Sequence, residues 1–288
     1  MKISVLAERR IIYLVLLIAV ALPLLFPIGW KTEVSGYTQM AYDLIENTPE
    51  NKVVIISFDY DPSTMTELQP MGEAMIEHAF KRDQKIIATA LWPMGVQMAE
   101  QAFEKVLRDY PDKKRGLDYV NLGYKVGGMV TIQAMGRDLK EVYPNDTRNT
   151  PYDQIPLLAN TRRLKDVAWV SSLSSGVPGL KEWMMVARDS YNVPVTGGCT
   201  AVSAPGFFPY VNEQRQLTGL LGGLKAASEY ESLIGRLGSA TTKMDAQSVA
   251  HLLILVFIAL GNIKVFVAKK KKTTKTKAFI IKRRKSND

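Results

Sequence analysis

Twenty consecutive residues near the start of the chain, 11–30 (IIYLVLLIAVALPLLFPIGW), carry no charge. In a helix with a rise of about 1.5 Å per residue, about 20 apolar residues cross the roughly 30 Å hydrocarbon layer of a membrane. The run is long for a secretory signal peptide, has no small-x-small cleavage site and ends in Trp30, a residue type of membrane interfaces. We predict a transmembrane helix at 11–30, and a cleaved signal peptide is the alternative.

A second uncharged run covers 246–263 (AQSVAHLLILVFIALGNI) and is more polar than the first. The side chain of Lys264 can reach the headgroups and lengthen the usable span, so we predict a second transmembrane helix at 249–268. The segment that follows is rich in Lys and Arg, which is typical of a stop-transfer flank. A buried core helix is the alternative interpretation.

The basic residues predict the orientation of both spans. Three Lys or Arg residues precede the first run and one follows it directly, whereas ten occur in the tail 269–288. Cytoplasmic flanks of membrane spans carry the excess of Lys and Arg. We therefore expect a protein of the cell membrane with residues 1–10 and the tail in the cytoplasm, and with 31–248 as an extracytoplasmic domain.

The net charge of +9 belongs to the tail, because 31–248 holds 23 Lys or Arg and 26 Asp or Glu, a balance of −3. A slightly acidic domain is a poor match for phosphates, which argues against a nucleic-acid partner. We expect the lipid bilayer as a partner. The tail would either touch anionic lipid or serve only as a disordered topology signal.

Cys199 is the only cysteine, and His78 and His251 are the only histidines. No intrachain disulfide can form, and a zinc site of the usual His/Cys type lacks ligands. A Ser-His-Asp site has few candidates for its base, and Cys199 as a nucleophile would depend on His78, on a helix far along the chain. We expect no metal and no cofactor.

From residue 52 onward, short apolar runs alternate with segments of helical periodicity. Strands are predicted at 52–58, 85–91, 117–123, 166–173 and 193–199. Helices are predicted at 31–51, from Pro70, from Pro93, at 128–142, from Pro178 and at 213–235. This alternation indicates an α/β fold: a Rossmann-like or flavodoxin-like three-layer domain with about five mainly parallel strands, flanked by two transmembrane helices. The segment 144–165 is predicted to be an excursion loop, and Asn145 begins a glycosylation sequon within it.

Glycine, hydroxyl and aromatic residues collect after the predicted strands, whereas the opposite edge carries solvated charge. In an open parallel sheet, ligands bind beyond the carboxyl ends of the strands. We therefore predict a ligand-binding edge there. Its candidate residues are Asp59, Tyr60, Asp61, Trp92, Tyr124, Lys125, Ser171, Ser172, Gly197, Gly198, Thr200 and Phe207.

An apolar strand that ends in Asp59 and Asp61, followed by Ser63, resembles the first motif of the haloacid dehalogenase-like phosphotransferases. The resemblance implies a nucleophile at Asp59 and an acid/base at Asp61. It covers only 53–64, because 197–199 (GGC) stands where that family has the late acidic pair that holds magnesium. The structural alternative is that both aspartates shape the loop and accept backbone N–H bonds.

A second catalytic possibility is a Ser-Lys hydrolase that combines Lys125 with a serine of 171–175, such as Ser172. This chemistry needs a lysine that burial deprotonates beside the serine. The alternative is a solvated lysine and serines that cap the following helix.

Two features within 206–231 favour contact with a membrane-protein partner or a homo-oligomer. The segment 206–210 (GFFPY) exposes aromatic rings if it is a loop. Gly219, Gly223 and Ala227 place small residues on one face of the predicted final helix, which allows another backbone to approach. That face would pack either on the domain's own sheet or on a second copy.

The sequence thus predicts a two-pass membrane protein whose extracytoplasmic domain binds a small ligand or a membrane-protein partner at the carboxyl edge of its sheet, without catalysis. The alternatives are a membrane-anchored hydrolase or phosphoryl-transfer enzyme and a structural subunit of a membrane assembly.

Overall fold

The computed structural model describes residues 5–30, 32–212 and 216–284. It divides into two compact units, Gly29–Thr241 and the pair Met1–Ile28 with Thr242–Asp288, and each is described by itself. Four parts of predicted segments lie outside the described residues. They are 1–4 of the N-terminal flank, residue 31 of the helix predicted at 31–51, 213–215 of the final helix and 285–288 of the tail.

Six strands form one parallel sheet in the order β3-β2-β1-β4-β5-β6. They are β1 (Val53–Asp59), β2 (Lys85–Ala90), β3 (Tyr119–Tyr124), β4 (Val170–Ser174), β5 (Val195–Cys199) and β6 (Leu221–Gly222). This is the order of a doubly wound Rossmann-type sheet, which reverses its direction of growth between β1 and β4. The predicted α/β fold with a parallel sheet is confirmed, and β6 is a short strand that the sequence reasoning missed.

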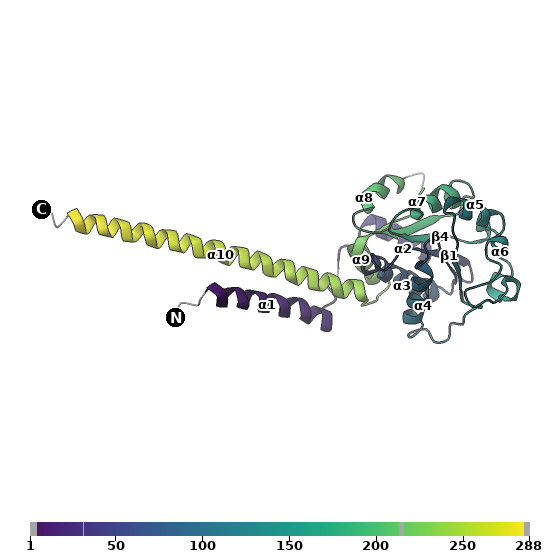
Figure 1. The fold of residues 1–288 in the computed structure, drawn as a ribbon, viewed down its shortest axis with the longest axis horizontal. Helices are drawn as coiled ribbons and strands as arrows, with labels where there is room; N and C mark the ends of the chain where they lie inside the picture. Colours follow the sequence, from purple (N-terminus) through teal and green to yellow (C-terminus); the bar gives the residue numbers. More distant parts are fainter. Residues whose placement is uncertain (1–4, 31, 213–215, 285–288) are drawn as a thin grey trace. The chain divides into compact units, whose positions relative to one another are not determined.

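Helices cover both faces of this sheet, which gives the three layers visible in Figure 1. One face carries α2 (Gly36–Glu46), α3 (Met65–Lys81), α4 (Gly95–Val106) and α9 (Gly223–Leu233). The other carries α5 (Met129–Arg137), α6 (Leu139–Val142) and α7 (Leu180–Trp183). Side chains of β1 alternate between the two cores, with Ile56 and Phe58 in the first and Ile55 in the second. Burial on both faces explains why this strand reads as a continuous apolar run.

Short helical segments complete the connections. A π-helical turn, Met184–Arg188, continues α7, and α8 (Ala204–Phe207) follows β5. Within the described residues, 3₁₀ turns occur at Tyr152–Gln154, Pro156–Leu158, Leu164–Asp166 and Phe208–Tyr210. The third of these turns delays the start of β4 to Val170, four residues later than predicted.

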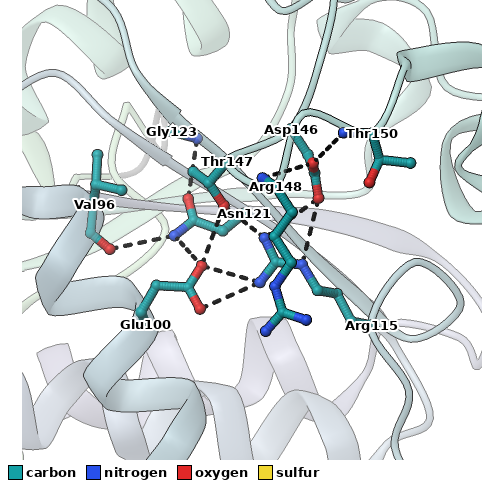
Figure 2. A network of polar contacts seen from close by, with 9 residues as sticks. All are labelled: Val96, Glu100, Arg115, Asn121, Gly123, Asp146, Thr147, Arg148 and Thr150. Carbon is teal, nitrogen blue, oxygen red and sulfur yellow. Dashed lines mark hydrogen bonds and ion pairs between the residues drawn. The ribbon is translucent and has the colours of Figure 1, made fainter.

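The predicted excursion loop packs against the edge strand β3 (Figure 2). The Thr147 N–H donates to the Asn121 carbonyl of β3 at 3.0 Å, so the loop pairs a backbone group that an edge strand would otherwise expose. Arg115 donates to both carboxylate oxygens of Glu100 (3.0 and 3.2 Å), to Asp146 Oδ2 (3.3 Å) and to Thr147 Oγ1 (2.6 Å). We call these five residues the β3 network.

Two predicted helices begin elsewhere. α3 begins at Met65, after a turn in which the Thr64 N–H donates to the Asp61 carbonyl, so Pro70 lies inside the helix and not at its start. The prediction of one helix over 213–235 is wrong in its first part. Gly219 has a φ of +132°, and Leu221–Gly222 pairs with β5 before α9 begins.

The predicted small-residue helix face is therefore not formed, because Gly219 precedes the helix that holds Ala227. Gly219 does allow a close approach, but within the domain. A Cβ at this position would lie 2.3 Å from the backbone nitrogen of Ala41 in α2. The aromatic segment 206–210 also has a contact within the domain, since the Phe208 ring stacks on Tyr37 at 4.7 Å.

The unit outside the sheet domain contains α1 (Val5–Leu25) and most of α10 (Ser239–Arg284). Among the described residues, one helical segment is long and apolar enough to cross a membrane. It is Ser239–Phe266, which is 28 residues long and contains an 18-residue stretch with a mean hydropathy of 2.2. An apolar helix over most of the predicted second span is thus confirmed.

The prediction of two such helices is not confirmed, because α1 does not meet the same criterion. This helix ends at Leu25, before Pro27, and starts early enough to include the charged residues 8–10. Only the stretch from Ile11 to Leu25 is both helical and uncharged, and it is shorter than the roughly 20 residues that cross a bilayer.

Two polar contacts show that α1 runs antiparallel to α10. Lys264 Nζ pairs with Glu8 Oε1 at 2.8 Å, and the Ile28 N–H donates to Asp245 Oδ2 at 2.9 Å. Residue numbers therefore rise along one helix as they fall along the other.

Candidate functional site

Asp59, the last residue of β1, is fully buried and accepts four hydrogen bonds. Its Oδ1 accepts from Ser57 Oγ (2.7 Å) and from the Leu91 N–H (2.8 Å). Its Oδ2 accepts from Ser172 Oγ (2.6 Å) and from Trp183 Nε1 (3.1 Å). These donors come from β1, the end of β2, β4 and α7, so the carboxylate joins three strands to a helix.

Burial raises the pKa of Asp59 to about 6, because removal from water penalises the ionised form. The four hydrogen bonds oppose this shift only in part, and no cation among the described residues pairs with the carboxylate. Two more buried hydroxyls, on Thr89 and Tyr143, find no hydrogen-bond partner within the described chain. Burial, followed by the charge of Asp59, raises the pKa of Tyr143. Asp59 thus belongs to a closed polar layer inside the domain.

The loop between β4 and α7 covers the carboxyl end of β1. Trp92 Nε1, after β2, donates to the Pro178 carbonyl of this loop at 2.7 Å, and the Ser175 N–H donates to the Asp59 carbonyl at 3.2 Å. A Cβ on Gly176 would lie 3.3 Å from the Trp92 ring, so loop and ring are in contact. The crevice expected at the reversal point is therefore closed over β1, and the open part of this edge lies toward β2 and β3.

The geometry gives no support to phosphoryl transfer of the haloacid dehalogenase type. Asp61 accepts hydrogen bonds from the Ser63 N–H (2.9 Å) and hydroxyl (2.5 Å), which is the loop-shaping role named as the alternative. Gly197 and Gly198, at the place of the late acidic pair, are buried in β5. In the part of the chain that the structure describes, no three His, Cys, Asp or Glu side chains gather in a way that could hold a metal ion.

A Ser-Lys pair is not assembled either. Lys125 Nζ lies 5.6 Å from the centroid of the Tyr143 ring, and within the described ranges it makes no hydrogen bond to a serine. Ser171 and Ser172 are buried, and Ser172 donates to Asp59.

The remaining candidates divide between core and surface. Tyr60 is buried and donates to Gln69 at 2.6 Å, and a Cβ on Gly197 would lie 2.2 Å from the Ser172 carbonyl oxygen. Other candidates are partly exposed at the carboxyl edge or in the loops after it: Asp61, Trp92, Tyr124, Lys125, Thr200 and Phe207. The structure therefore leaves about half of the predicted set within reach of a solute.

A cavity of about 480 Å³ opens at this edge, and we call it the carboxyl-edge cavity. Its lining residues are Leu91, Tyr124, Val126, Gly127, Gly128, Met129, Val177, Pro178 and Glu182. They come from the ends of β2 and β3, the start of α5, the loop after β4 and α7. Tyr124 is the one member of the predicted ligand-binding set in this lining. Glu182 is the one charged residue of the lining, and it was not in the predicted set. Its Oε2 accepts a hydrogen bond from the Gly179 N–H at 2.8 Å.

Exposed valines lie in the lining of this cavity and next to it in sequence. Val126 and Val177 line it and are 79% and 75% exposed, and Val130, in the first turn of α5, is 68% exposed. The predicted ligand-binding set does not contain these valines, because it was based on glycine, polar and aromatic residues after the strands. The usable signal was an apolar side chain in a loop beside glycine or proline, as in VGG at 126–128 and GVP at 176–178.

Other cavities lie elsewhere on the described part of the domain, and two of them are large enough to compare. One of about 540 Å³ is at the amino edge of the sheet, beside Lys52, Ala168 and Pro194, so that edge is hollowed as well as charged. Another, of about 460 Å³, lies beside the β3 network and is lined in part by Arg115 and Arg148. We favour the carboxyl-edge cavity, because ligands of doubly wound sheets bind at that edge.

Comparison with known proteins adds no family. No protein-family model and no curated protein matches the sequence. The crystal structure of AibC is similar over 76% of this chain and 50% of its own, with 12% sequence identity and a TM-score of 0.31. The chain spans about half the length of that protein, and a likeness at this TM-score carries no argument.

Proposed function

We propose that this domain is a non-catalytic binding module, held at a membrane, that takes a small ligand in the carboxyl-edge cavity. The observation that carries the proposal is the cavity itself. Its volume of about 480 Å³ lies within the roughly 300–1,000 Å³ typical of small-molecule sites, and its wall is apolar with few polar groups. It also lies at the edge where doubly wound sheets bind their ligands.

A binding role fits the acidic residues better than a catalytic one. A nucleophile or general base must come within hydrogen-bond reach of the substrate. Asp59 is shut inside the domain with four donors, and Asp61 is engaged by Ser63. The apolar cavity needs neither of them.

The binding proposal is tested by closing the mouth of the cavity. We expect Val126→Arg to fill the opening, and Val202→Arg is the matched control, because Val202 is 91% exposed and lies outside the lining. Ligand-observed NMR of small fluorinated amines, acids and alcohols would be run with the full chain in lipid nanodiscs. Fragments should bind the wild type and Val202→Arg, but not Val126→Arg. The proposal is overturned if no fragment binds the wild type, or if Val126→Arg binds fragments as the wild type does.

We further propose that the chain is a two-pass protein of the cell membrane, with both flanks cytoplasmic and 31–248 outside. Three observations support this topology. Ser239–Phe266 is long and apolar enough to span, α1 is antiparallel to α10, and ten basic residues lie in the tail. The first crossing would be made by the uncharged sequence 11–30, whose helical part ends at Leu25. Contact of the tail with anionic lipid, and of 206–231 with a protein partner, are further predictions.

Cysteine labelling tests this topology. Cys199, the one native cysteine, is buried and burial raises its pKa to about 12, so it gives little background. A membrane-impermeant maleimide should label Asn145→Cys, at an exposed position, in intact cells. It should label Thr274→Cys, in the tail, only after lysis. Labelling of both positions in intact cells, or of Asn145→Cys only after lysis, would contradict the topology.

A further inference from the structure

We infer that the carboxyl-edge cavity selects a ligand with an apolar body and one positive charge, of the class of protonated primary amines. This inference rests on the proposed binding function and adds the chemical class of the ligand. It follows from the apolar wall, from the single charged group in that wall, and from a comparison of the Glu182 charge with the helix dipole at the start of α5.

The wall of the cavity recognises hydrocarbon. Three apolar members of the lining differ in exposure: Leu91 is 4% exposed, whereas Val126 and Val177 have most of their surface in water. Removal of apolar surface from water is favourable in proportion to the area buried. A ligand with an apolar body would cover these exposed valines, whereas a fully polar ligand would leave them in water.

Glu182 brings the only formal charge to this wall. Its Oε2 accepts the Gly179 N–H, which orients the carboxylate at the start of α7. Within the described residues, no lysine, arginine or histidine nitrogen lies within 4.0 Å of it. Two cations are next in sequence to lining residues. Lys125 lies over the Tyr143 ring, and Lys181 is exposed. The carboxylate is therefore available to a cation from solution.

A charge-assisted hydrogen bond from an ammonium group would satisfy this carboxylate. Tyr124 adds an aromatic ring to the same lining, and aromatic faces attract ammonium groups. The two groups favour the same class of ligand, because both act on a positive charge at the end of an apolar body.

The start of α5 is a feature of the lining that favours the opposite charge. Gly127 and Gly128 precede this helix, and a helix N-terminus acts on an anion as roughly half a positive charge. Glu182 carries a full negative charge in the same cavity. An anionic ligand would meet net repulsion, so the larger charge decides the selectivity.

Three probes that share one ring system test the inference: 2-phenylethylamine, 2-phenylethanol and 3-phenylpropionate. Each is titrated by NMR against the full chain in nanodiscs. We expect the amine to bind at least tenfold more tightly than the alcohol, and the carboxylate to bind most weakly. Glu182→Gln keeps an oxygen that can accept the Gly179 N–H, so the fold should be retained while the affinity for the amine falls about tenfold. The affinity for the alcohol should not change.

The matched control is Glu141→Gln, an exposed acid in α6 outside the cavity lining, which should leave all three affinities unchanged. If the alcohol or the carboxylate binds the wild type as tightly as the amine, the amine class is wrong and the binding function stands. Retention of the amine preference in Glu182→Gln would also overturn the inference. If no probe binds and Val126→Arg changes nothing, both the inference and the proposed function fail.

Discussion

Asp59 and Asp146 are both buried carboxylates of the same domain, yet their surroundings move the pKa in opposite directions. Burial raises the pKa of Asp59 to about 6, and four neutral donors only partly offset it. Burial also acts to raise the pKa of Asp146, but the N–H groups of Thr150 and Arg148 and the guanidinium of Arg115 outweigh it. The pKa of Asp146 is therefore lowered.

The difference between these two pKa shifts shows that hydrogen bonds from neutral donors stabilise a buried carboxylate less than hydrogen bonds combined with a cation do. Neutral donors satisfy the lone pairs of Asp59 and fix its geometry, but they replace only part of the solvation that the charge had in water. Asp146 gains a cation as well, and its partner Arg115 is held in turn by Glu100. Asp59 therefore joins β1, β4 and α7 at a cost in charge burial, whereas Asp146 fixes its loop at little such cost.

The largest expected effect is loss of the Asp59 side chain. Asp59→Ala would leave four buried donors without an acceptor, each worth about 1–3 kcal/mol when unsatisfied. Because the two serine hydroxyls can rotate toward other acceptors, we expect a loss of about 3–5 kcal/mol in the free energy of unfolding. Chemical denaturation of the full chain in detergent measures it.

Asp59→Asn is the control, because it keeps the size of the side chain and replaces one of the two acceptor oxygens by an NH₂ group. Either orientation of its amide group sets an NH₂ against an N–H that can only donate, at Leu91 or at Trp183. This variant should also be destabilised, though less than Asp59→Ala. An Asp59→Asn variant as stable as the wild type would show that the four hydrogen bonds do not hold the domain together.

The second effect is a pH dependence that belongs to Asp59. Its folded pKa of about 6 lies above the ordinary value of 3.8, so the folded protein binds more protons than the unfolded chain between these values. The contribution of Asp59 to the free energy of unfolding is greatest at low pH. It falls by about 3 kcal/mol as pH rises from about 4 to about 6, and is level above. Asp59→Asn should lose this slope, and a slope unchanged in the variant would assign it to other groups.

Asp59 also shows which features of the structure can be predicted from the sequence and which cannot. The apolar run that ends in Asp59 correctly predicted a buried strand with an acid at its carboxyl end. The same sequence is compatible with a catalytic nucleophile and with a buried structural carboxylate. Which of the two Asp59 becomes depends on Trp183, which lies 124 positions further along the chain. Local periodicity contains no information about which distant helix closes over a strand end. For a related reason β6 was missed, since a two-residue strand has no periodicity to detect.

The smallest effect should come from Asp146→Asn. The amide oxygen can still accept the N–H groups of Arg148 and Thr150, as Asp146 Oδ1 does now at 2.8 and 2.9 Å. The ion pair with Arg115 is lost, but Arg115 keeps Glu100. We expect a loss of about 1–2 kcal/mol in the free energy of unfolding at neutral pH.

The sign of the pH dependence tests the same variant. A lowered folded pKa gives Asp146 a contribution to stability that is present above its ordinary value and is lost as pH falls below it. The difference between wild type and Asp146→Asn should therefore shrink in acid, whereas the Asp59 slope runs the other way. If the two variants instead changed the pH profile in the same direction, the contrast between neutral and charged partners would not explain these two sites.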